Sequence, residues 1–208
     1  MSTDRREFYL RRLHSLSGIV PIGAYVVVHI MLENVMVLGG PGRFDALVQA
    51  IGAMPPPLLL AIEVFGLWGP ILFHAVYGVV RVRQASFDDL RADNVGSYLY
   101  VLQRLTGVIA FVFIAYHVWS TRVQYYLGRA EIDFAFMHAK MIDPLVMAVY
   151  LVGVGASVFH FCNGIWTFCV TWGLTVRVEA QRAVRAFSMV LFAVMYGTAF
   201  AILMAFRA

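Results

Sequence analysis

The sequence predicts an all-α membrane protein with five transmembrane helices in a bundle, the N-terminus in the cytoplasm and the C-terminus outside. Of its 208 residues, 61% are hydrophobic and only 13% are charged, which is too apolar for a soluble domain of this length. Five apolar segments are long enough to cross a bilayer, which takes about 20 residues per helix. Basic residues gather at one set of segment ends, and this bias sets the orientation.

The five segments form one transmembrane domain, 1–208, and lie at about 13–38, 58–82, 98–127, 143–173 and 184–206. Helix breakers or charges separate them, as in GGPGRFD and PPP between 39 and 57, RVRQASFDDLRADNVGS at 81–97 and TVRVEAQR at 175–182. The N-terminal MSTDRREFYLRR is charged, and the apolar run behind it is too long for a cleavable signal. We therefore expect the first helix to remain in the protein.

The orientation follows from the 16 basic residues. With the N-terminus inside, 11 of them lie on the inner side, as the positive-inside rule requires: Arg5, Arg6, Arg11, Arg12, Arg81, Arg83, Arg91, Arg104, Arg177, Arg182 and Arg185. The net charge of +4 therefore reflects topology and does not indicate nucleic-acid binding. Cys162 and Cys169 are seven residues apart on one predicted helix, about 10 Å, so we expect no disulfide between them.

Each of the first four predicted helices carries one histidine deep within its apolar run, whereas His14 lies at the inner boundary of the first. His29 and His117 come 16 and 19 residues into helices that enter from the inside, so both lie in the outer half of the membrane. His74 and His160 come 16 and 17 residues into helices that enter from the outside, so both lie in the inner half. The four therefore form two depth-matched pairs, each drawn from two helices.

Ionisable residues at this depth are costly and mark functional sites. A neutral imidazole is a good iron ligand, and a haem held by two of them has no open position and carries electrons. Small residues at helical spacing would leave room for a porphyrin; they are Gly153, Ala156 and Gly164 around His160, Gly78 around His74, and Gly18 around His29. The residues alone leave two interpretations open, a di-haem cytochrome or a haem-free proton-coupled transporter with a histidine relay.

Four motifs narrow this choice: FYLRRLHSLSGIVPIG, FHAVYGV, LQRLTGVI followed by HVWSTR, and FHFCNGIWTFCVTWGLTV. Together they resemble the cytochrome b membrane-anchor subunit of succinate dehydrogenases and fumarate reductases, in its single-polypeptide, five-helix, two-haem form. The resemblance covers nearly the whole chain. It implies two haem b groups, one distal from the soluble subunits on His29 and His117, and one proximal on His74 and His160. A di-haem cytochrome b of a hydrogenase or formate dehydrogenase remains an alternative.

The resemblance also implies a complex in a bacterial cytoplasmic membrane. A flavoprotein with covalent FAD would oxidise succinate or reduce fumarate, and an iron–sulfur subunit would relay electrons. This multi-pass chain would exchange them with a quinone, usually menaquinone, and would take no part in the dicarboxylate chemistry. The oligomeric state stays open, including a higher oligomer of the complex. Some fumarate reductases of this type have a glutamate two residues before the fourth-helix histidine, where this chain has Val158.

Residues at the inner boundary are candidates for the propionates of the inner haem, because arginine matches a carboxylate with paired donors. They are His14, Ser15, Ser17 and Arg104. Quinone reduction takes up two protons, so its site needs donors to the carbonyls and a proton-conducting carboxylate. Near the outer helix ends, Glu33, Asn34 and Arg122 have this chemistry. The competing interpretation of the first group is that they are interface residues without a cofactor contact. That of the second group is that they are solvated helix ends.

Two further segments have simpler interpretations. His138, in the outer stretch EIDFAFMHAKMID, is expected to be a solvated or interfacial loop residue. The inner loop 81–97 mixes arginine and aspartate, and we expect it to dock the iron–sulfur subunit.

Overall fold

The computed structural model describes residues 3–83 and 95–208, which form helices joined by short connections and contain no strand. Within these ranges, five helices are long and apolar enough to cross a membrane, which confirms the predicted fold class. We call them spans I to V: Arg5–Gly39, Pro56–Arg83, Tyr98–Tyr126, Pro144–Thr171 and Val178–Arg207.

Spans I to III each consist of several helical pieces. Span I contains α1 (Thr3–Ser17), η1 (Gly18–Gly23), α2 (Ala24–Val28), η2 (His29–Glu33) and η3 (Asn34–Gly39); span II contains α4 (Pro56–Ala61), η4 (Ile62–Trp68) and α5 (Gly69–Arg83); span III contains α6 (Val95–Val118), η6 (Trp119–Val123) and α7 (Gln124–Tyr126). Spans IV and V are uninterrupted, as α9 (Pro144–Thr171) and α10 (Val178–Arg207). η3 is a 3₁₀ helix, whereas η1, η2, η4 and η6 are π-helical.

Span I begins about ten residues earlier than predicted, because the charged N-terminal stretch continues the helix. Arginine, glutamate and leucine are good helix formers. Glu7 also accepts a hydrogen bond from Arg11, one turn later, at 2.5 Å. Pro21 lies inside η1, where its missing N–H and its ring would break a regular α-helix. The wider π turn accommodates it.

The sequence did not predict two short helices, α3 (Pro41–Gly52) and α8 (Phe134–Ile142). α3 begins with Pro41, directly after Gly40 at φ +102°, a conformation that favours glycine. α8 begins at Asp133, whose side chain accepts the backbone N–H of Phe136 at 2.7 Å. His138 therefore lies on a helix and not in a loop, so that expectation was wrong.

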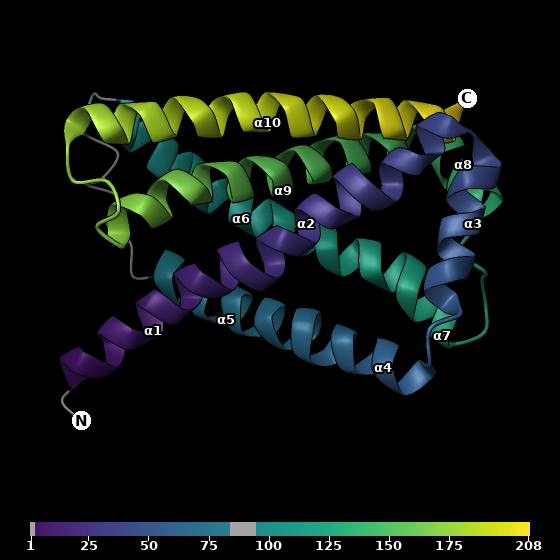
Figure 1. Ribbon diagram of the computed structural model, residues 1–208, viewed down its shortest axis with the longest axis horizontal. Helices are drawn as coiled ribbons and strands as arrows, with labels where there is room; N and C mark the ends of the chain where they lie inside the picture. Colours follow the sequence, from purple (N-terminus) through teal and green to yellow (C-terminus); the bar gives the residue numbers. More distant parts are fainter. Residues whose placement is uncertain (1–2, 84–94) are drawn as a thin grey trace.

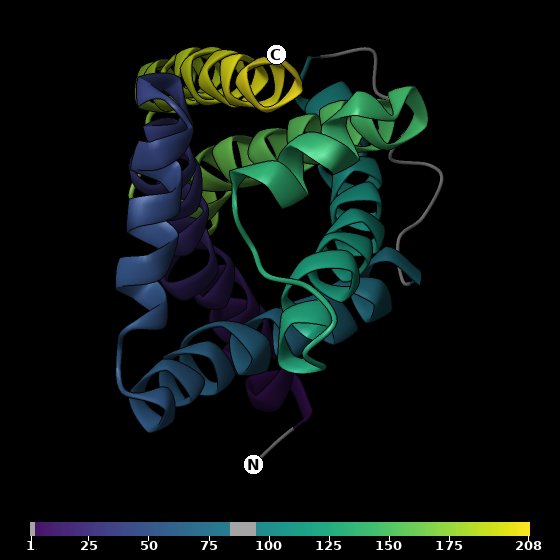
Figure 2. The ribbon, with the colours of Figure 1, turned by 90° about the vertical axis from the view of Figure 1, so that its right-hand side faces the viewer.

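The N-terminus and the C-terminus lie at opposite ends of the bundle, called here the N-end and the C-end (Figure 1). α9 packs against α6 on one side and α10 on the other (Figure 2). α1 packs against α5, and η1 contacts both α5 and α9. α3 and α8 lie across the C-end, where they contact each other and α8 contacts α9 and α10.

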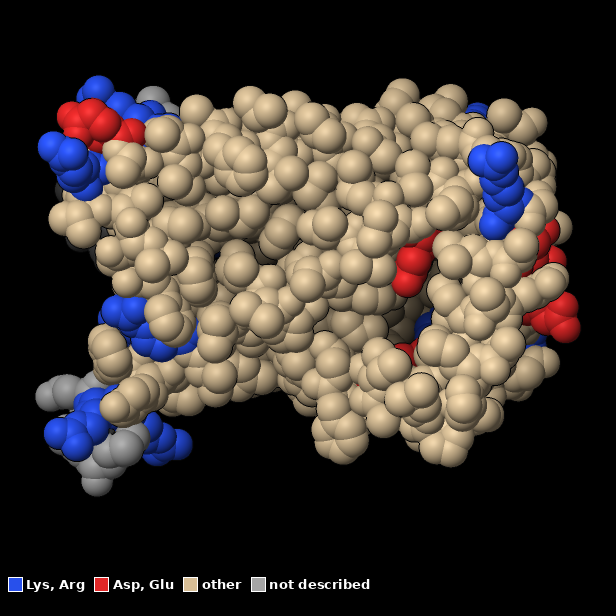
Figure 3. All heavy atoms as spheres, in the orientation of Figure 1, with Lys and Arg blue, Asp and Glu red and all other residues tan. Residues whose placement is uncertain are grey.

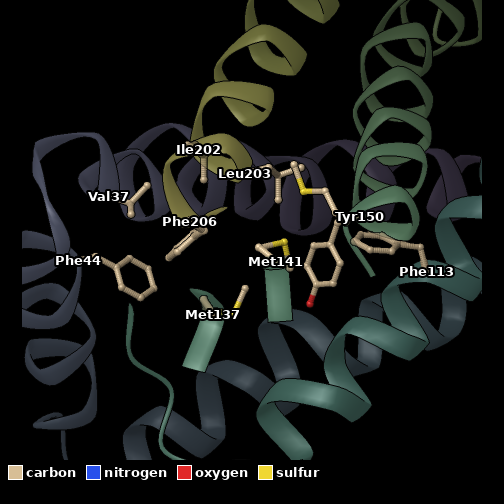
Figure 4. Packing of buried hydrophobic residues seen from close by; sticks show 10 residues of the cluster. Val37, Phe44, Phe113, Met137, Met141, Tyr150, Ile202, Leu203 and Phe206 are labelled. Carbon is tan, nitrogen blue, oxygen red and sulfur yellow. The ribbon is translucent and has the colours of Figure 1, made fainter. Parts of the chain in front are cut away.

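The largest cluster of buried apolar side chains lies at the C-end (Figure 4). Phe206, 1% exposed, packs the edge of its ring against Phe44 with centroids 4.9 Å apart. Met141 is a residue of α8, and its side chain fills the space between that helix and Tyr150 of α9. Nδ1 of His138 also donates to the carbonyl of Phe206 at 2.8 Å. These contacts fix α3 and α8 over the ends of α9 and α10.

The outer surface of the bundle is apolar along its length. Large apolar side chains in the middle of the spans, such as Leu72, Val112, Val152 and Val190, are more than half exposed. Charged groups gather at the two ends on the face shown in Figure 3, with a wide uncharged band between them. A bilayer would cover this band. Cys162 and Cys169 are both free, as predicted.

Candidate functional site

The structure brings the four membrane histidines together in the two predicted pairs. The ring centroids of His29 and His117 are 6.1 Å apart, with an angle of 68° between the rings. Those of His74 and His160 are 6.0 Å apart, with an angle of 87°. The first pair, called the C-end pair, joins spans I and III, and the second, called the N-end pair, joins spans II and IV.

Backbone carbonyls orient both rings of the N-end pair. Nδ1 of His74 donates to the carbonyl of His14 at 3.0 Å, and Nδ1 of His160 donates to the carbonyl of Gln103 at 2.9 Å. A carbonyl only accepts, so Nδ1 carries the proton in each ring and Nε2 keeps its lone pair. The side-chain amide of Gln103 returns a bond to the carbonyl of His160 at 3.0 Å, which locks α6 to α9 at this level.

Side chains orient the C-end pair. Nδ1 of His29 lies 2.9 Å from Oε2 of Glu33 and 3.2 Å from the hydroxyl of Tyr25. Nδ1 of His117 lies 3.1 Å from the hydroxyl of Tyr150. In the described part of the chain, Nε2 makes no hydrogen bond in either ring of either pair. Metal-binding histidines are held in this way, with one nitrogen on a protein partner and the other available to the metal.

Two glycines let neighbouring helices approach the rings of the N-end pair. A Cβ on Gly18 would lie 2.6 Å from Cε1 of His74, and one on Gly107 would lie 2.7 Å from Cε1 of His160. Gly18 was expected beside His29, so that expectation was wrong. η1 of span I contacts α5 of span II, so Gly18 faces His74 on the neighbouring helix. Gly153 was also expected to leave room for a porphyrin, but the ring of Phe113 fills the space beside it.

The paired rings fit a haem better than a bare metal ion. Two metal–nitrogen bonds of about 2 Å each, with each centroid about 1 Å behind its nitrogen, place the centroids about 6 Å apart, close to the separations in both pairs. Among the described residues, no group of three or more His, Cys, Asp or Glu side chains could hold a metal ion. A porphyrin would supply the remaining ligands that an iron ion needs.

The propionate candidates are only partly brought together. His14 stacks on His74 with centroids 4.0 Å apart, and its Nε2 is buried without a partner among the described residues. Ser17 donates to the carbonyl of His14 at 2.9 Å. Arg104 instead binds the hydroxyl of Tyr100 and stacks on that ring at 3.8 Å. Ser15 is half-buried, and its side chain makes no hydrogen bond to any residue in 3–83 or 95–208.

Two of the residues predicted to form the quinone site make hydrogen bonds within span I. Glu33 is bonded to the ring of His29, and Asn34 donates to the carbonyl of His29 at 2.7 Å. The third candidate binds a residue of a neighbouring span, because Nε of Arg122 donates to Oε1 of Glu63 at 2.8 Å and Nη2 lies 2.5 Å from the same oxygen. This pairing joins spans II and III.

Sequence reasoning missed several residues that hold the site together. Tyr25 lies one turn before His29, so its spacing was a usable signal. Gln103 lies within LQRLTGVI, a motif used above, but no role was assigned to it. Tyr150 carried no signal, because a tyrosine in an apolar helix is usually a packing residue. The proposed docking loop 81–97 falls largely on residues 84–94, outside the described residues.

Lys140 is a half-buried cation close to the C-end pair but outside the spans. Its Nζ donates to the carbonyl of Ser120 at 2.8 Å and lies over the ring of Phe136 at 5.1 Å. Burial lowers the pKa of this amine below its ordinary value. Lys140 thus ties α8 to η6, three residues beyond His117.

These features define a class of protein, a multi-pass helical membrane protein whose bundle holds paired imidazoles of the kind found in membrane cytochromes b. Residues 83–200 match a family model described as succinate dehydrogenase/fumarate reductase transmembrane subunit. The chain is also 36% identical over 190 residues to the succinate dehydrogenase cytochrome b558 subunit of Bacillus subtilis (strain 168), across 91% of this chain and 92% of that one. The chain belongs to the family of succinate dehydrogenase/fumarate reductase transmembrane cytochrome b subunits. This membership favours that family over the hydrogenase and formate dehydrogenase alternative.

Proposed function

We propose that this chain is the membrane anchor of a succinate:quinone oxidoreductase and carries electrons between an iron–sulfur subunit and membrane quinone through two haem b groups. One observation carries the proposal. All four membrane histidines bind protein partners through Nδ1 and stand in two facing pairs about 6 Å apart. Its relative from Bacillus subtilis, a cytochrome b558 subunit of succinate dehydrogenase, supports the same function.

In this proposal His29 and His117 hold the haem nearer the C-end, and His74 and His160 hold the haem nearer the N-end. When bound, haem would supply a one-electron carrier. The protein's part is to fix the imidazoles. The carbonyls of His14 and Gln103 do so for the N-end pair, and Glu33 and Tyr150 do so for the C-end pair.

We assign His14, Ser15, Ser17 and Arg104 to the propionates of the N-end haem. The unpartnered Nε2 of His14 gives the strongest support, because a buried polar atom without a partner costs about 1–3 kcal/mol. A propionate oxygen would satisfy it. Ser17, one turn along the same helix, lies 3.3 Å from Nδ1 of His74.

We place the quinone, of the menaquinone type, near the C-end pair. Its reduction adds two electrons and two protons, one proton to each carbonyl oxygen. Arg122 supplies N–H donors for a carbonyl, whereas Glu33 and Asn34 line the end of span I beside His29.

The complex we propose contains a flavoprotein with FAD and an iron–sulfur subunit, both at the N-end, which faces the cytoplasm. The N-terminal stretch, the end of α5 and residues 177–185 carry most of the basic residues and lie on this side. The C-end then faces outward in a bacterial cytoplasmic membrane.

The test is a reduced-minus-oxidised spectrum with a pyridine haemochrome count on purified protein, wild type beside His160→Ala. We expect two b haems per chain in the wild type, and loss of the N-end haem alone in the variant. Fully assembled wild-type protein without haem would refute the proposal and return the histidines to a proton path.

A further inference from the structure

Glu63 is a buried carboxylate within a membrane-spanning helix. It lies in η4 of span II and is only 9% exposed. A charged group in this position is expensive, and replacing a buried ion pair by apolar residues is often neutral or stabilising. Stability therefore gives no reason to keep a carboxylate here, and its partners indicate what it does.

Glu63 uses both of its oxygens to hold one arginine. Oε1 accepts a hydrogen bond from Nε of Arg122 and lies 2.5 Å from Nη2, and Oε2 accepts the hydroxyl of Tyr126 at 2.5 Å. Nη2 of Arg122 also donates to that hydroxyl at 3.3 Å, which closes a ring of hydrogen bonds. The guanidinium lies over the rings of Tyr125 and Tyr126, at 4.8 and 4.7 Å. The arginine is thus fixed by a carboxylate and two aromatic faces.

This arrangement leaves one end of the guanidinium available. Arginine has five N–H donors in a planar fork, and the ring of hydrogen bonds engages Nε and Nη2 only. Nη1 of Arg122 donates to no side chain or carbonyl in residues 3–83 and 95–208. A rigid cation that presents unused N–H donors suits a neutral carbonyl oxygen, which accepts without bringing a second charge into the membrane.

The cluster lies at the same end of the bundle as the polar residues beside the C-end pair. Arg122 is five residues beyond His117 in span III, and Glu33 and Tyr25 both contact Nδ1 of His29. On the face shown in Figure 3, acidic and basic atoms lie in a hollow near the C-end, within otherwise uncharged surface. Glu33, Glu63 and Arg122 all lie on π-helical turns, which occur frequently at functional sites.

We propose that Glu63 is the positioning residue of the quinone site, where it holds Arg122 so that Nη1 donates to a quinone carbonyl. The inference rests on the proposed function and extends it from Arg122 to a residue 59 positions earlier in the chain. Glu63 accepts hydrogen bonds from an arginine and a tyrosine, and these bonds orient the donor. The two protons of quinone reduction come from the aqueous phase on the C-end side, and the two electrons come from the iron–sulfur subunit.

The test uses the intact complex with Glu63→Gln, Arg122→Gln and the double variant. Glu131→Gln is the matched control, because Glu131 is an exposed carboxylate at the same end. Three quantities are measured: kcat and KM for a water-soluble menaquinone analogue, the dissociation constant of that analogue, and succinate oxidation by an artificial dye that bypasses the quinone. Haem content and the dye-linked rate report assembly.

We expect Glu63→Gln and Arg122→Gln each to weaken binding of the analogue and raise its KM by about tenfold or more, as loss of a charge-assisted hydrogen bond does. The dye-linked rate, the haem content and the Glu131→Gln control should match the wild type. The double variant should be no worse than Arg122→Gln alone, because Glu63 acts through Arg122.

Normal quinone binding in Glu63→Gln beside impaired binding in Arg122→Gln would overturn the inference and leave the proposed function intact. Additive losses in the double variant would also overturn it. Normal binding of the analogue in Arg122→Gln would show that Arg122 is not part of the quinone site. This result would also overturn the inference about Glu63. If Glu63→Gln does not assemble, Tyr126→Phe removes the two hydrogen bonds of that hydroxyl from the ring and leaves the pairing of Glu63 with Arg122 in place. We expect a smaller rise in KM there, and an unchanged KM would count against the inference.

Discussion

Gly107→Ala tests whether the close approach of span III holds the N-end pair in place. The new Cβ would lie 2.7 Å from Cε1 of His160 and 3.0 Å from Nδ1. Ordinary contact begins at 3.4 Å, so the ring has to retreat by 3.4 − 2.7 = 0.7 Å. A metal–ligand bond tolerates only about 0.2 Å, and the bond from Nδ1 to the carbonyl of Gln103 is already 2.9 Å long.

Overpacking of this kind costs about 1–3 kcal/mol, which corresponds to a loss of affinity of about fivefold or more, since 1.4 kcal/mol is a factor of ten. We therefore expect the pyridine haemochrome count of Gly107→Ala to fall from two haems per chain toward one, with the spectrum of the C-end haem unchanged. Gly197→Ala is the control, because a Cβ there meets nothing within 4 Å and the gain in helix propensity is the same. Two haems with unaltered spectra in Gly107→Ala would refute the reasoning.

Three further predictions concern the C-end. His29→Ala should remove the C-end haem and leave the N-end haem, so a haemochrome count of two in that variant would contradict the pairing. Glu33→Gln replaces a charged hydrogen-bond partner by a neutral one, a difference of about 1 kcal/mol. At 59 mV per factor of ten, this should raise the midpoint potential of the C-end haem by about 40 mV in a redox titration and leave the other haem unmoved. Asp133→Ala removes the side chain that caps α8 and should lower the stability of the protein by about 1 kcal/mol. The loss should appear as a lower melting temperature in detergent. An unchanged melting temperature, equal to that of Glu131→Gln, would show that the cap is dispensable.

The spans and the histidine pairing could be predicted from the sequence because both follow from length and depth. A residue's position along a straight spanning helix fixes its height in the membrane. Two histidines at the same height on different helices can meet without any knowledge of the loops. The structure brings together both predicted pairs.

Contacts that depend on helix rotation could not be predicted in this way. Gly18 faces His74 and not His29, because helical spacing relates residues on one helix and gives no information about the neighbouring one. The same limit hid the bond between Arg122 and Glu63. α8 was missed for a different reason. Its polar residues resemble a connection, whereas Asp133 caps a helix that buries Met137 and Met141, one turn apart, in the C-end core.

The two histidine pairs differ in what their Nδ1 atoms bind, and this difference predicts which haem has the lower midpoint potential. The N-end pair donates to neutral backbone carbonyls, whereas His29 of the C-end pair donates to the carboxylate of Glu33. A nearby negative charge stabilises the more positive, oxidised state of an iron centre and makes its imidazole ligand more basic. The C-end haem should therefore have the lower midpoint potential. An electron moving from the N-end toward the C-end would then move to the weaker acceptor, an order that suits a quinone of low potential and fits the menaquinone type.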